Sequence, residues 1–142
     1  MRVVVAGGTG YIGTHLLSEL AGAGHEATVL TRRAPGEAGD LPGGAQPVQW
    51  DPAQPGPALL RTLSGAGAVV NLAGTSIGGR PWTPRRRLSI LQSRVRATKT
   101  LVDAIAELDP PLRPGVLVNA SGIDYYGDRG EEPVPEPAPA GS

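Results

Sequence analysis

The sequence predicts an α/β fold built on a doubly wound parallel sheet. Short runs rich in β-branched residues alternate with segments of helical periodicity, and a glycine-rich turn joins the first strand to the first helix. The 142 residues are 39% hydrophobic, which matches one domain with a real core. We expect residues 1–127 to form this domain and residues 128–142, which are rich in Pro, Gly and Glu, to form a disordered tail.

The first 31 residues predict a strand, a turn, a helix and a second strand. Arg2–Ala6 is an apolar β-branched run of the kind found in buried parallel strands, and Ala27–Thr31 is the second such run. The turn Gly7–Gly13 lies between them and opens a helix that Gly22 and Gly24 end. The apolar face expected for this helix consists of Ile12, Leu16, Leu17 and Leu20.

The same alternation continues to residue 120, so that the chain supplies the first five strands of a doubly wound sheet. Without a sixth strand, the outer edge would be open to pairing. A long helix is predicted from apolar residues at helical spacing, which we expect to face the core: Leu88, Leu91, Val95, Val102 and Ile105. The predicted elements are a loop at Ala34–Gly44, a strand at Pro47–Trp50, a helix at Pro57–Leu63, a strand at Ala66–Leu72, a helix at Pro84–Leu108 and a strand at Gly115–Ala120.

Composition excludes several classes of protein. The chain has no Cys and two His, which excludes disulfides, thiolate metal sites and a Cys nucleophile and predicts no metal site. No apolar run approaches the roughly 20 residues of a membrane helix, and the N-terminus lacks the apolar region of a signal peptide. We therefore expect a cytoplasmic protein that has no membrane partner.

The net charge of zero conceals an asymmetry along the chain. Residues 1–99 carry a net charge of +6 and residues 100–142 carry −6. An acid-free basic run extends from Arg80 to Lys99, but Trp82 is its one aromatic residue, whereas nucleic-acid surfaces interleave several aromatic and basic side chains. We therefore interpret the run as a solvated helix face near an anionic ligand and expect no nucleic-acid partner.

The segment from Gly7 to Gly13 predicts dinucleotide binding. Gly8, Gly10 and Gly13 satisfy G-x-G-x-x-G, and Gly7, Gly10 and Gly13 satisfy G-x-x-G-x-x-G. In either reading the glycines permit a tight turn and a close backbone approach, so the helix N-terminus can bind a pyrophosphate. A tight turn without a ligand is the alternative. Candidate cofactor-binding residues here are Gly7, Thr9, Gly10, Tyr11, Ile12 and Gly13.

The end of the second strand favours NADP over NAD. NAD sites place a carboxylate there, about 20 residues beyond the glycines, to bind the ribose hydroxyls. This chain has Thr31, Arg32 and Arg33 instead, and a guanidinium pairs with a 2′-phosphate. Two solvated arginines are the alternative. Asp51 is a candidate for contacting adenine or, equally, for capping the turn at Pro52.

Three motifs together resemble the extended short-chain dehydrogenase/reductases. They are Gly7-Gly8-Thr9-Gly10-Tyr11-Ile12-Gly13, Asn71-Leu72-Ala73-Gly74 and Tyr125-Tyr126-Gly127-Asp128, and they are most similar to an NADP-binding epimerase branch of that superfamily. The resemblance implies an NADP-dependent epimerase or oxidoreductase that acts on a sugar-nucleotide-like or carbonyl substrate. It also implies that Leu72, Ala73, Gly74 and Arg94 contact the cofactor, and that family members extend beyond the length of this chain.

The catalytic pair of that superfamily is missing. The resemblance implies a Tyr-x-x-x-Lys pair and a nearby Ser, yet the chain contains no Tyr-x-x-x-Lys, and Tyr125 and Arg129 share its spacing within a loop. Ser121 and Tyr126 are the remaining catalytic candidates, although either could serve the local fold. A non-catalytic NADP-binding module or an inactive fragment is therefore the alternative to an enzyme. Homo-oligomer formation is left open.

Overall fold

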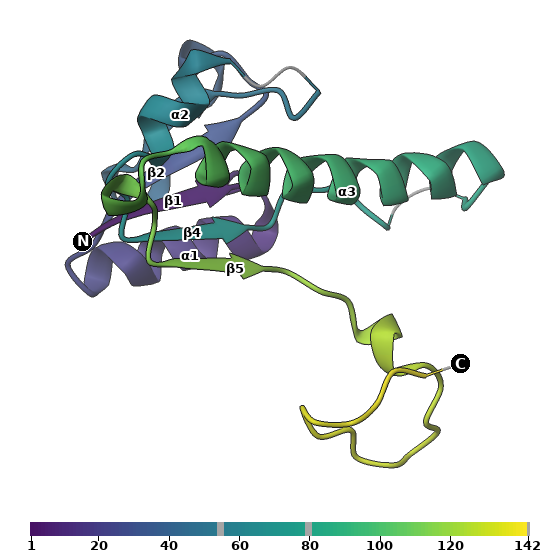
Figure 1. Cartoon of the computed structure of the whole chain (residues 1–142). Coiled ribbons are helices and arrows are strands. Elements are labelled where there is room, and N and C mark those ends of the chain that lie inside the picture. The colour runs from purple at the N-terminus through teal and green to yellow at the C-terminus, as the bar shows by residue number, and fades with distance from the viewer. Residues whose placement is uncertain (54–55, 79–80, 142) are drawn as a thin grey trace.

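The computed structural model describes residues 1–53, 56–78 and 81–141. Its strands are β1 (Arg2–Ala6), β2 (Glu26–Thr31), β3 (Gln46–Gln49), β4 (Ala68–Asn71) and β5 (Val116–Asn119), and its α-helices are α1 (Tyr11–Gly22), α2 (Pro57–Leu63) and α3 (Pro84–Glu107). The strands form one parallel sheet in the order β3-β2-β1-β4-β5 (Figure 1). The predicted α/β fold with a doubly wound parallel sheet is confirmed.

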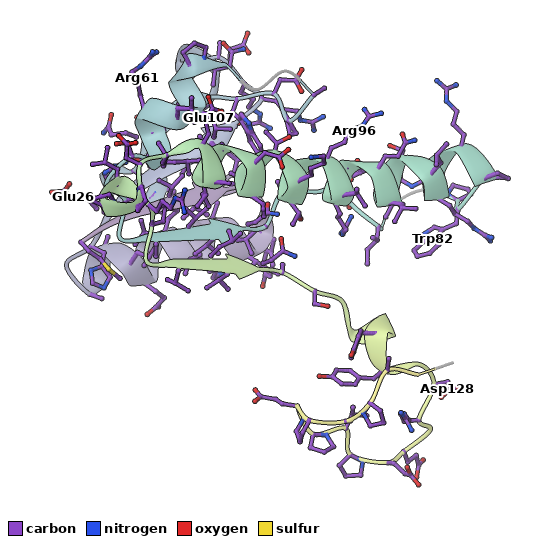
Figure 2. The ribbon with its side chains drawn as sticks, viewed as in Figure 1. Glu26, Arg61, Trp82, Arg96, Glu107 and Asp128 are labelled. Atoms are coloured by element: carbon purple, nitrogen blue, oxygen red, sulfur yellow. The ribbon has the colours of Figure 1, made fainter. Side chains whose placement is uncertain are left out.

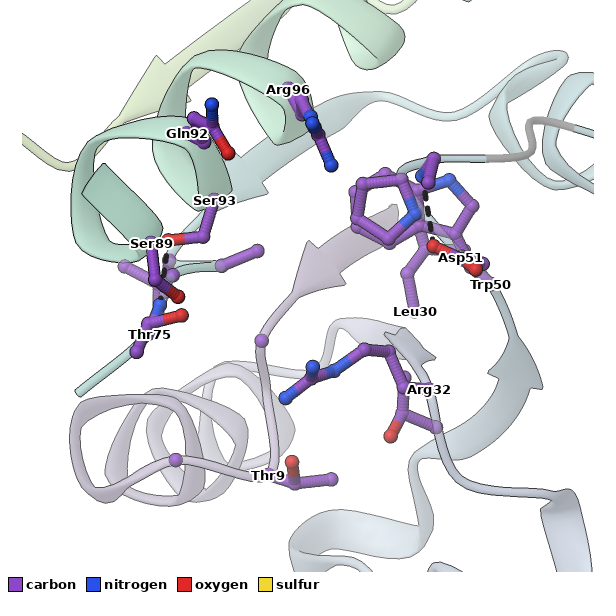
Figure 3. A pocket seen from close by; sticks show the side chains of 18 of the residues that line it. Thr9, Leu30, Arg32, Trp50, Asp51, Thr75, Ser89, Gln92, Ser93 and Arg96 are labelled. Carbon is purple, nitrogen blue, oxygen red and sulfur yellow. Dashed lines mark hydrogen bonds between the residues drawn. The ribbon is translucent and has the colours of Figure 1, made fainter. Parts of the chain in front are cut away.

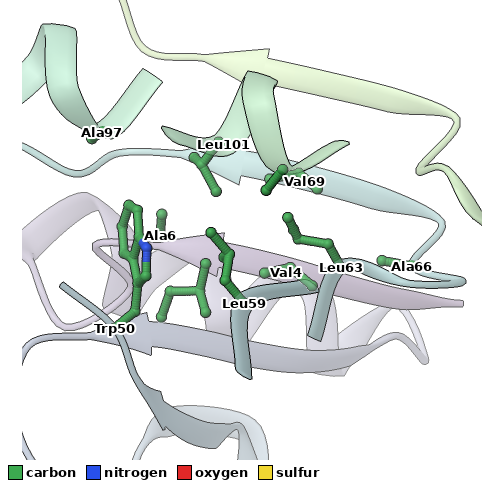
Figure 4. Packing of buried hydrophobic residues seen from close by; sticks show 11 residues of the cluster. Val4, Ala6, Trp50, Leu59, Leu63, Ala66, Val69, Ala97 and Leu101 are labelled. Atoms are coloured by element: carbon green, nitrogen blue, oxygen red, sulfur yellow. The ribbon is translucent and has the colours of Figure 1, made fainter. Parts of the chain in front are cut away.

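Helices cover both faces of the sheet, because alternate residues of each strand point to opposite sides. On one face, Val3 and Val5 of β1 pack against Leu17 of α1. On the other, Val4 and Ala6 lie in a cluster to which α2 and α3 contribute (Figure 4). That second cluster also contains Leu30, Trp50, Leu59, Leu63, Ala66, Val69, Ala97, Leu101 and Ala104.

The buried face of α3 differs from the predicted one. Leu88, Leu91, Val95 and Val102 are 46–60% exposed, and of the predicted core positions Ile105 alone packs partly against the core. The N-terminal part of α3 extends beyond the ends of the strands, so the apolar side chains there have no sheet beneath them (Figure 1). Val102 lies farther along, and at about 3.6 residues per turn it falls on the opposite side of the helix from the buried residues. The buried residues lie in the C-terminal half, where small side chains permit close approach: Ala97, Thr100, Leu101 and Ala104.

Two smaller differences concern the first third of the chain. Ile12, expected on the apolar face of α1, is 65% exposed because it lies in the first turn, at the end of the sheet; Leu17 is the residue buried there. The segment 34–44, expected to be a loop, contains 3-10 helices at Pro35–Glu37 and Pro42–Gly44. β3 contains Pro47, which cannot donate to a neighbouring strand, and it lies at the sheet edge where this is tolerated.

β5 lies at the opposite edge of the sheet. Its register with β4 pairs Val116 with Ala68 and Val118 with Val70. Ala68 and Val70 belong to the core cluster that contains Leu17 of α1, so Val116 and Val118 lie on the α1 face of the sheet. Val116 and Val118 are about half exposed, and no strand among the described residues pairs with the outer side of β5. The open edge expected from the sequence is therefore present in the part of the chain that the structure describes.

The residues after β5 run away from the sheet. Ile123–Tyr126 form a 3-10 helix, and residues 128–141 fold back on it as an extended loop (Figures 1 and 2). Arg129 connects the two arms of this loop, because its guanidinium donates to the Tyr126 carbonyl at 3.0 Å and to the Pro139 carbonyl at 3.1 Å. Within the described ranges, no helix is both long and apolar enough to cross a membrane.

Trp50 offers a test of this core. Its side chain is 5% exposed, and its indole N–H has no partner among the described residues. We expect Trp50→Ala to lower the free energy of unfolding by about 3–5 kcal/mol, because it leaves a large cavity. Trp50→Phe should cost less than about 1.5 kcal/mol, since it keeps an aromatic ring and gives up no hydrogen bond. Urea unfolding followed by circular dichroism measures both, and equal losses for the two variants would contradict this expectation.

Candidate functional site

A cavity lies at the carboxyl ends of the strands, between the glycine turn and α3. It has a volume of about 870 Å³, which is ample for a cofactor-sized ligand. β1 lies at the point where strand order reverses, with β2 on one side and β4 on the other. Connections leave such a point in opposite directions and open a crevice, which is where doubly wound folds bind ligands.

The glycine turn between β1 and α1 forms one wall. Gly7 has a positive φ of 80°, and a Cβ there would lie 2.8 Å from the Leu72 carbonyl carbon of the segment after β4. A Cβ on Gly13 would lie 2.6 Å from Gly8 Cα and 2.7 Å from the Gly7 carbonyl oxygen. Because these neighbours are backbone atoms, they cannot move aside. The turn therefore requires glycine at both positions.

Gly10 is different, because a Cβ there would meet only the Gly7 carbonyl oxygen at 3.4 Å. It is the N-cap of α1, which has no side-chain cap and no acidic residue in its first turn. The amide N–H groups of Tyr11, Ile12 and Gly13 thus have no acceptor among the described residues. Such unpaired donors at the positive end of a helix dipole suit an anion.

The end of β2 forms the next wall and places Arg32 beside the glycine turn. Figure 3 shows the Arg32 guanidinium on the same side of the cavity as Thr9. The side chain of Thr31 is buried, and its hydroxyl accepts the Arg33 amide at 3.2 Å, which shapes this corner. The charges lining the cavity are four arginines and two carboxylates: Arg32, Arg33, Arg85, Arg96, Glu37 and Asp51.

Asp51 follows β3 and caps the turn at Pro52, which is one of its two predicted roles. One of its carboxylate oxygens accepts the Ala53 amide at 2.8 Å, which closes the turn around Pro52. Asp51 also lines the cavity, next to Trp50 (Figure 3). Capping and a ligand contact are thus compatible, because a carboxylate has a second oxygen.

The segment after β4 forms the wall nearest α3, and a buried amide supports it. Asn71 is 4% exposed, and its side-chain N–H group donates to Asn119 Oδ1 at 2.7 Å and to Thr98 Oγ1 at 3.2 Å. Its own oxygen accepts the Ala73 amide at 3.1 Å. Asn71 thereby ties β5 and α3 to the strand end from which Leu72, Ala73 and Gly74 line the cavity.

One face of α3 closes the cavity, and its residues were not among the predicted cofactor-binding residues. Arg85, Ser89, Gln92 and Arg96 recur at steps of four, three and four residues, which puts them on one side of the helix. All four line the cavity, and Figure 3 shows Arg96 above the Trp50 side of it. The helical spacing of these polar residues could have identified them as one face. However, apolar residues of the same helix have a similar spacing, and they were predicted to face the core instead.

The basic side chains between Arg80 and Lys99 thus make several different contacts. Arg86 donates to the carbonyls of Ser76 and Gly78 at 2.6 and 3.2 Å, and Lys99 pairs with Asp103 at 2.6 Å. Arg94 is outside the cavity lining; its guanidinium donates to the Thr75 carbonyl at 3.1 Å. Arg80 lies outside the described residues.

Of the predicted cofactor-binding residues, most come together at this cavity. Gly13, Tyr11, Ile12 and Arg94 are not in its lining, although the first three supply the amide groups at the start of α1. The predicted residues that line it are Gly7, Thr9, Gly10, Thr31, Arg32, Arg33, Asp51, Leu72, Ala73 and Gly74.

The two catalytic candidates lie elsewhere. Ser121 and Tyr126 are not in the cavity lining, since the chain turns away from the sheet after β5 (Figure 1). The Tyr126 hydroxyl donates to the Glu136 carbonyl at 3.2 Å, and its ring packs edge-on against Tyr125, with centroids 5.2 Å apart. No group of three His, Cys, Asp or Glu side chains suited to a metal ion occurs among the described residues.

Comparison with known proteins agrees with this geometry. Residues 3–142 match the family described as the NAD dependent epimerase/dehydratase family. The epimerase family protein SDR39U1 homolog of Arabidopsis thaliana is 36% identical over 148 residues, which cover 99% of this chain and 40% of the relative. Human SDR39U1 is 35% identical over 128 residues, covering 89% and 38%. The chain therefore spans about two fifths of the length of these relatives.

Solved structures show the same fold with bound dinucleotides. Human SDR39U1 (isoform 2), solved with NADPH, superposes with a TM-score of 0.78 at 34% identity and covers 99% of this chain and 43% of the human chain. UDP-glucose 4-epimerase of Stenotrophomonas maltophila, solved with NAD, gives a TM-score of 0.76 at 26% identity and covers 99% and 42%. Nicotinamide dinucleotides of both kinds thus occur on this fold.

Proposed function

This chain belongs to the NAD-dependent epimerase/dehydratase family, and from that premise we propose that its cavity binds NADP(H) for an epimerase or oxidoreductase. The observation that carries the proposal is the placement of Arg32 beside the glycine turn within one cavity. The unpaired amides of α1 suit the pyrophosphate, and the guanidinium groups of Arg32 and Arg33 suit the 2′-phosphate. The bound nicotinamide would supply hydride exchange with the substrate.

For the substrate we propose a sugar-nucleotide-like or carbonyl compound. A relative with 27% identity and a TM-score of 0.73, MoeE5, was solved with UDP-glucose and NAD, which supports this class. Ser121 and Tyr126 remain the proposed catalytic residues. A non-catalytic NADP-binding module is the second candidate, favoured by the missing Tyr-x-x-x-Lys and because neither Ser121 nor Tyr126 is in the cavity lining.

Titration of the chain with NADPH and NADH, followed by heat or nicotinamide fluorescence, tests the proposal. We expect both to bind, and NADPH to bind at least about tenfold more tightly, because one charge-assisted hydrogen bond to the 2′-phosphate contributes that much. Free nicotinamide is the control and should not bind, since it lacks the pyrophosphate and the 2′-phosphate. A folded sample that binds neither dinucleotide would contradict the proposal, and a preference for NADH would overturn its NADP part.

A further inference from the structure

The backbone of Thr75 is held by two neighbouring residues of α3. The Thr75 amide donates to Ser93 Oγ at 2.9 Å, and the Thr75 carbonyl accepts Arg94 Nη1 at 3.1 Å. The Ser93 hydroxyl in turn donates to the Ile90 carbonyl at 2.8 Å, which leaves its oxygen lone pairs for the Thr75 amide. Figure 3 shows Ser93 beside Thr75. The amide and the carbonyl of Thr75 are thus both hydrogen-bonded to side chains, which lie 18 and 19 positions away in the sequence.

Gly74 provides the space for this arrangement. A Cβ on Gly74 would lie 2.9 Å from Arg94 Nη1 and 3.1 Å from Arg94 Cζ. The Arg94 guanidinium therefore lies over the Cα of Gly74, on its way to the Thr75 carbonyl. A side chain at position 74 would push the guanidinium aside and so weaken its hydrogen bond to the Thr75 carbonyl.

The other end of the same segment is tied to the sheet. The Leu72 amide donates to the Ala6 carbonyl at 2.8 Å, and the Ala73 amide donates to Asn71 Oδ1 at 3.1 Å. Residues 72–75 are therefore fixed by strand β1 at one end and by α3 at the other. All four line the cavity, and so does Ser93, whereas Arg94 does not.

We propose that Ser93 and Arg94 are positioning residues for the dinucleotide, and that they act through the backbone of Leu72–Thr75. The proposal rests on the proposed function of the cavity. Arg94 would thus hold the segment Leu72–Thr75 in place through the Thr75 carbonyl, without contacting a phosphate group of the cofactor. Its effect is on the shape of the wall, and the wall lies across the cavity from Arg32 (Figure 3). NADPH and NADH should therefore depend on it equally.

Binding of NADPH and NADH to Arg94→Met, which keeps an unbranched side chain but removes the donor, is the first test. We expect the Kd of both cofactors to rise by the same factor, about three- to tenfold, as expected for the loss of one hydrogen bond that is exposed to solvent. Arg87→Met is the matched control: it removes the same charge from the same helix, and Arg87 is exposed and not in the cavity lining. Its affinities should equal those of the wild type.

A double-mutant cycle with Gly74→Ala provides the readout that general destabilisation would not produce. Gly74→Ala alone should weaken binding about as much as Arg94→Met, because the new methyl displaces the guanidinium. In the Arg94→Met background, the same methyl should have little further effect, so the two changes should be clearly non-additive. Circular dichroism of each variant confirms that the fold is retained.

Amide hydrogen exchange of the chain without cofactor tests the contact itself. Ser93→Ala removes the acceptor of the Thr75 amide, so exchange at Thr75 should accelerate several-fold, while exchange in β1 stays unchanged. Equal exchange at Thr75 in both proteins would overturn the proposal.

The binding results separate the two ideas. If the wild type binds both cofactors and Arg94→Met leaves both affinities unchanged, the positioning role is overturned alone. If Arg94→Met weakens NADPH and spares NADH, Arg94 contacts the 2′-phosphate, and the positioning role is again overturned. Failure of the folded wild type to bind either cofactor would overturn the proposed function, and the positioning role with it.

Discussion

Arg32→Asp is expected to weaken NADPH binding by about 100-fold or more and to leave NADH binding within a few-fold of the wild type. The change removes a guanidinium that can form two charge-assisted hydrogen bonds with a 2′-phosphate, each contributing about 1.5–3 kcal/mol. It also places a carboxylate where NAD-binding folds use one to bind ribose hydroxyls. Parallel calorimetric titrations with the two cofactors measure the change in preference.

A charge-matched control separates this local effect from the field of the whole protein. Arg61 lies on α2 and is exposed, and it is not in the cavity lining (Figure 2). Arg61→Asp changes the net charge by the same amount, so it should lower NADPH affinity only slightly, and less at high salt. Similar losses in both variants would mean that Arg32 acts through long-range charge, with no contact to the 2′-phosphate.

Gly13→Ala is expected to abolish measurable binding of both cofactors and to lower the free energy of unfolding by about 1–3 kcal/mol or more. The added methyl would lie 2.6 Å from Gly8 Cα and 2.7 Å from the Gly7 carbonyl oxygen. Relieving that clash must move the turn away from the start of α1. The same movement displaces the amide groups that the pyrophosphate would bind. Urea unfolding and cofactor titration on one preparation measure both effects.

Gly22→Ala is the control for this substitution, because it lies on the same helix. Apart from its chain neighbours and the adjacent backbone of its own helix, no atom of the described residues lies within 4 Å of the position that a Cβ on Gly22 would occupy. Alanine has the higher helix propensity, so Gly22→Ala should leave binding unchanged and stabilise the fold by up to about 1 kcal/mol. Binding of either cofactor with wild-type affinity by Gly13→Ala would show that the turn has other room to adapt.

Several elements could be predicted from the sequence because neighbouring residues decide them. β1 and α2 have the predicted bounds, Arg2–Ala6 and Pro57–Leu63. The first is a β-branched run that is followed by glycine, and the second is an apolar segment opened by proline, which suits the first turn of a helix. The glycine turn is of the same kind, since its chemistry depends on residues within one short segment.

The candidate site could be predicted where it follows directly from strand ends. In a parallel sheet the carboxyl ends of β1, β2 and β4 lie at the same end of the sheet. The residues after each strand must therefore be close in space. Arg32 and Gly74 line the same cavity for this reason. The wall from α3 could not be found in this way, because its position depends on how far the helix extends past the sheet.

The sequence by itself determined that α3 is a helix with an apolar stripe and a basic face. The tertiary structure alone decided which side is buried, because a helix buries the face that a sheet is present to cover. Part of the N-terminal half of α3 extends beyond the strands (Figure 1), and Leu91 and Val95 in that half stay exposed, whereas Ala97 and Leu101 are fully buried in the cluster that contains Val69 of β4. The same overhang puts Arg85 and Arg96 over the cavity and lets Arg94 reach Thr75. The periodicity of apolar residues shows which side chains share a face of a helix. Which of those faces is buried depends on where the helix packs against the rest of the molecule.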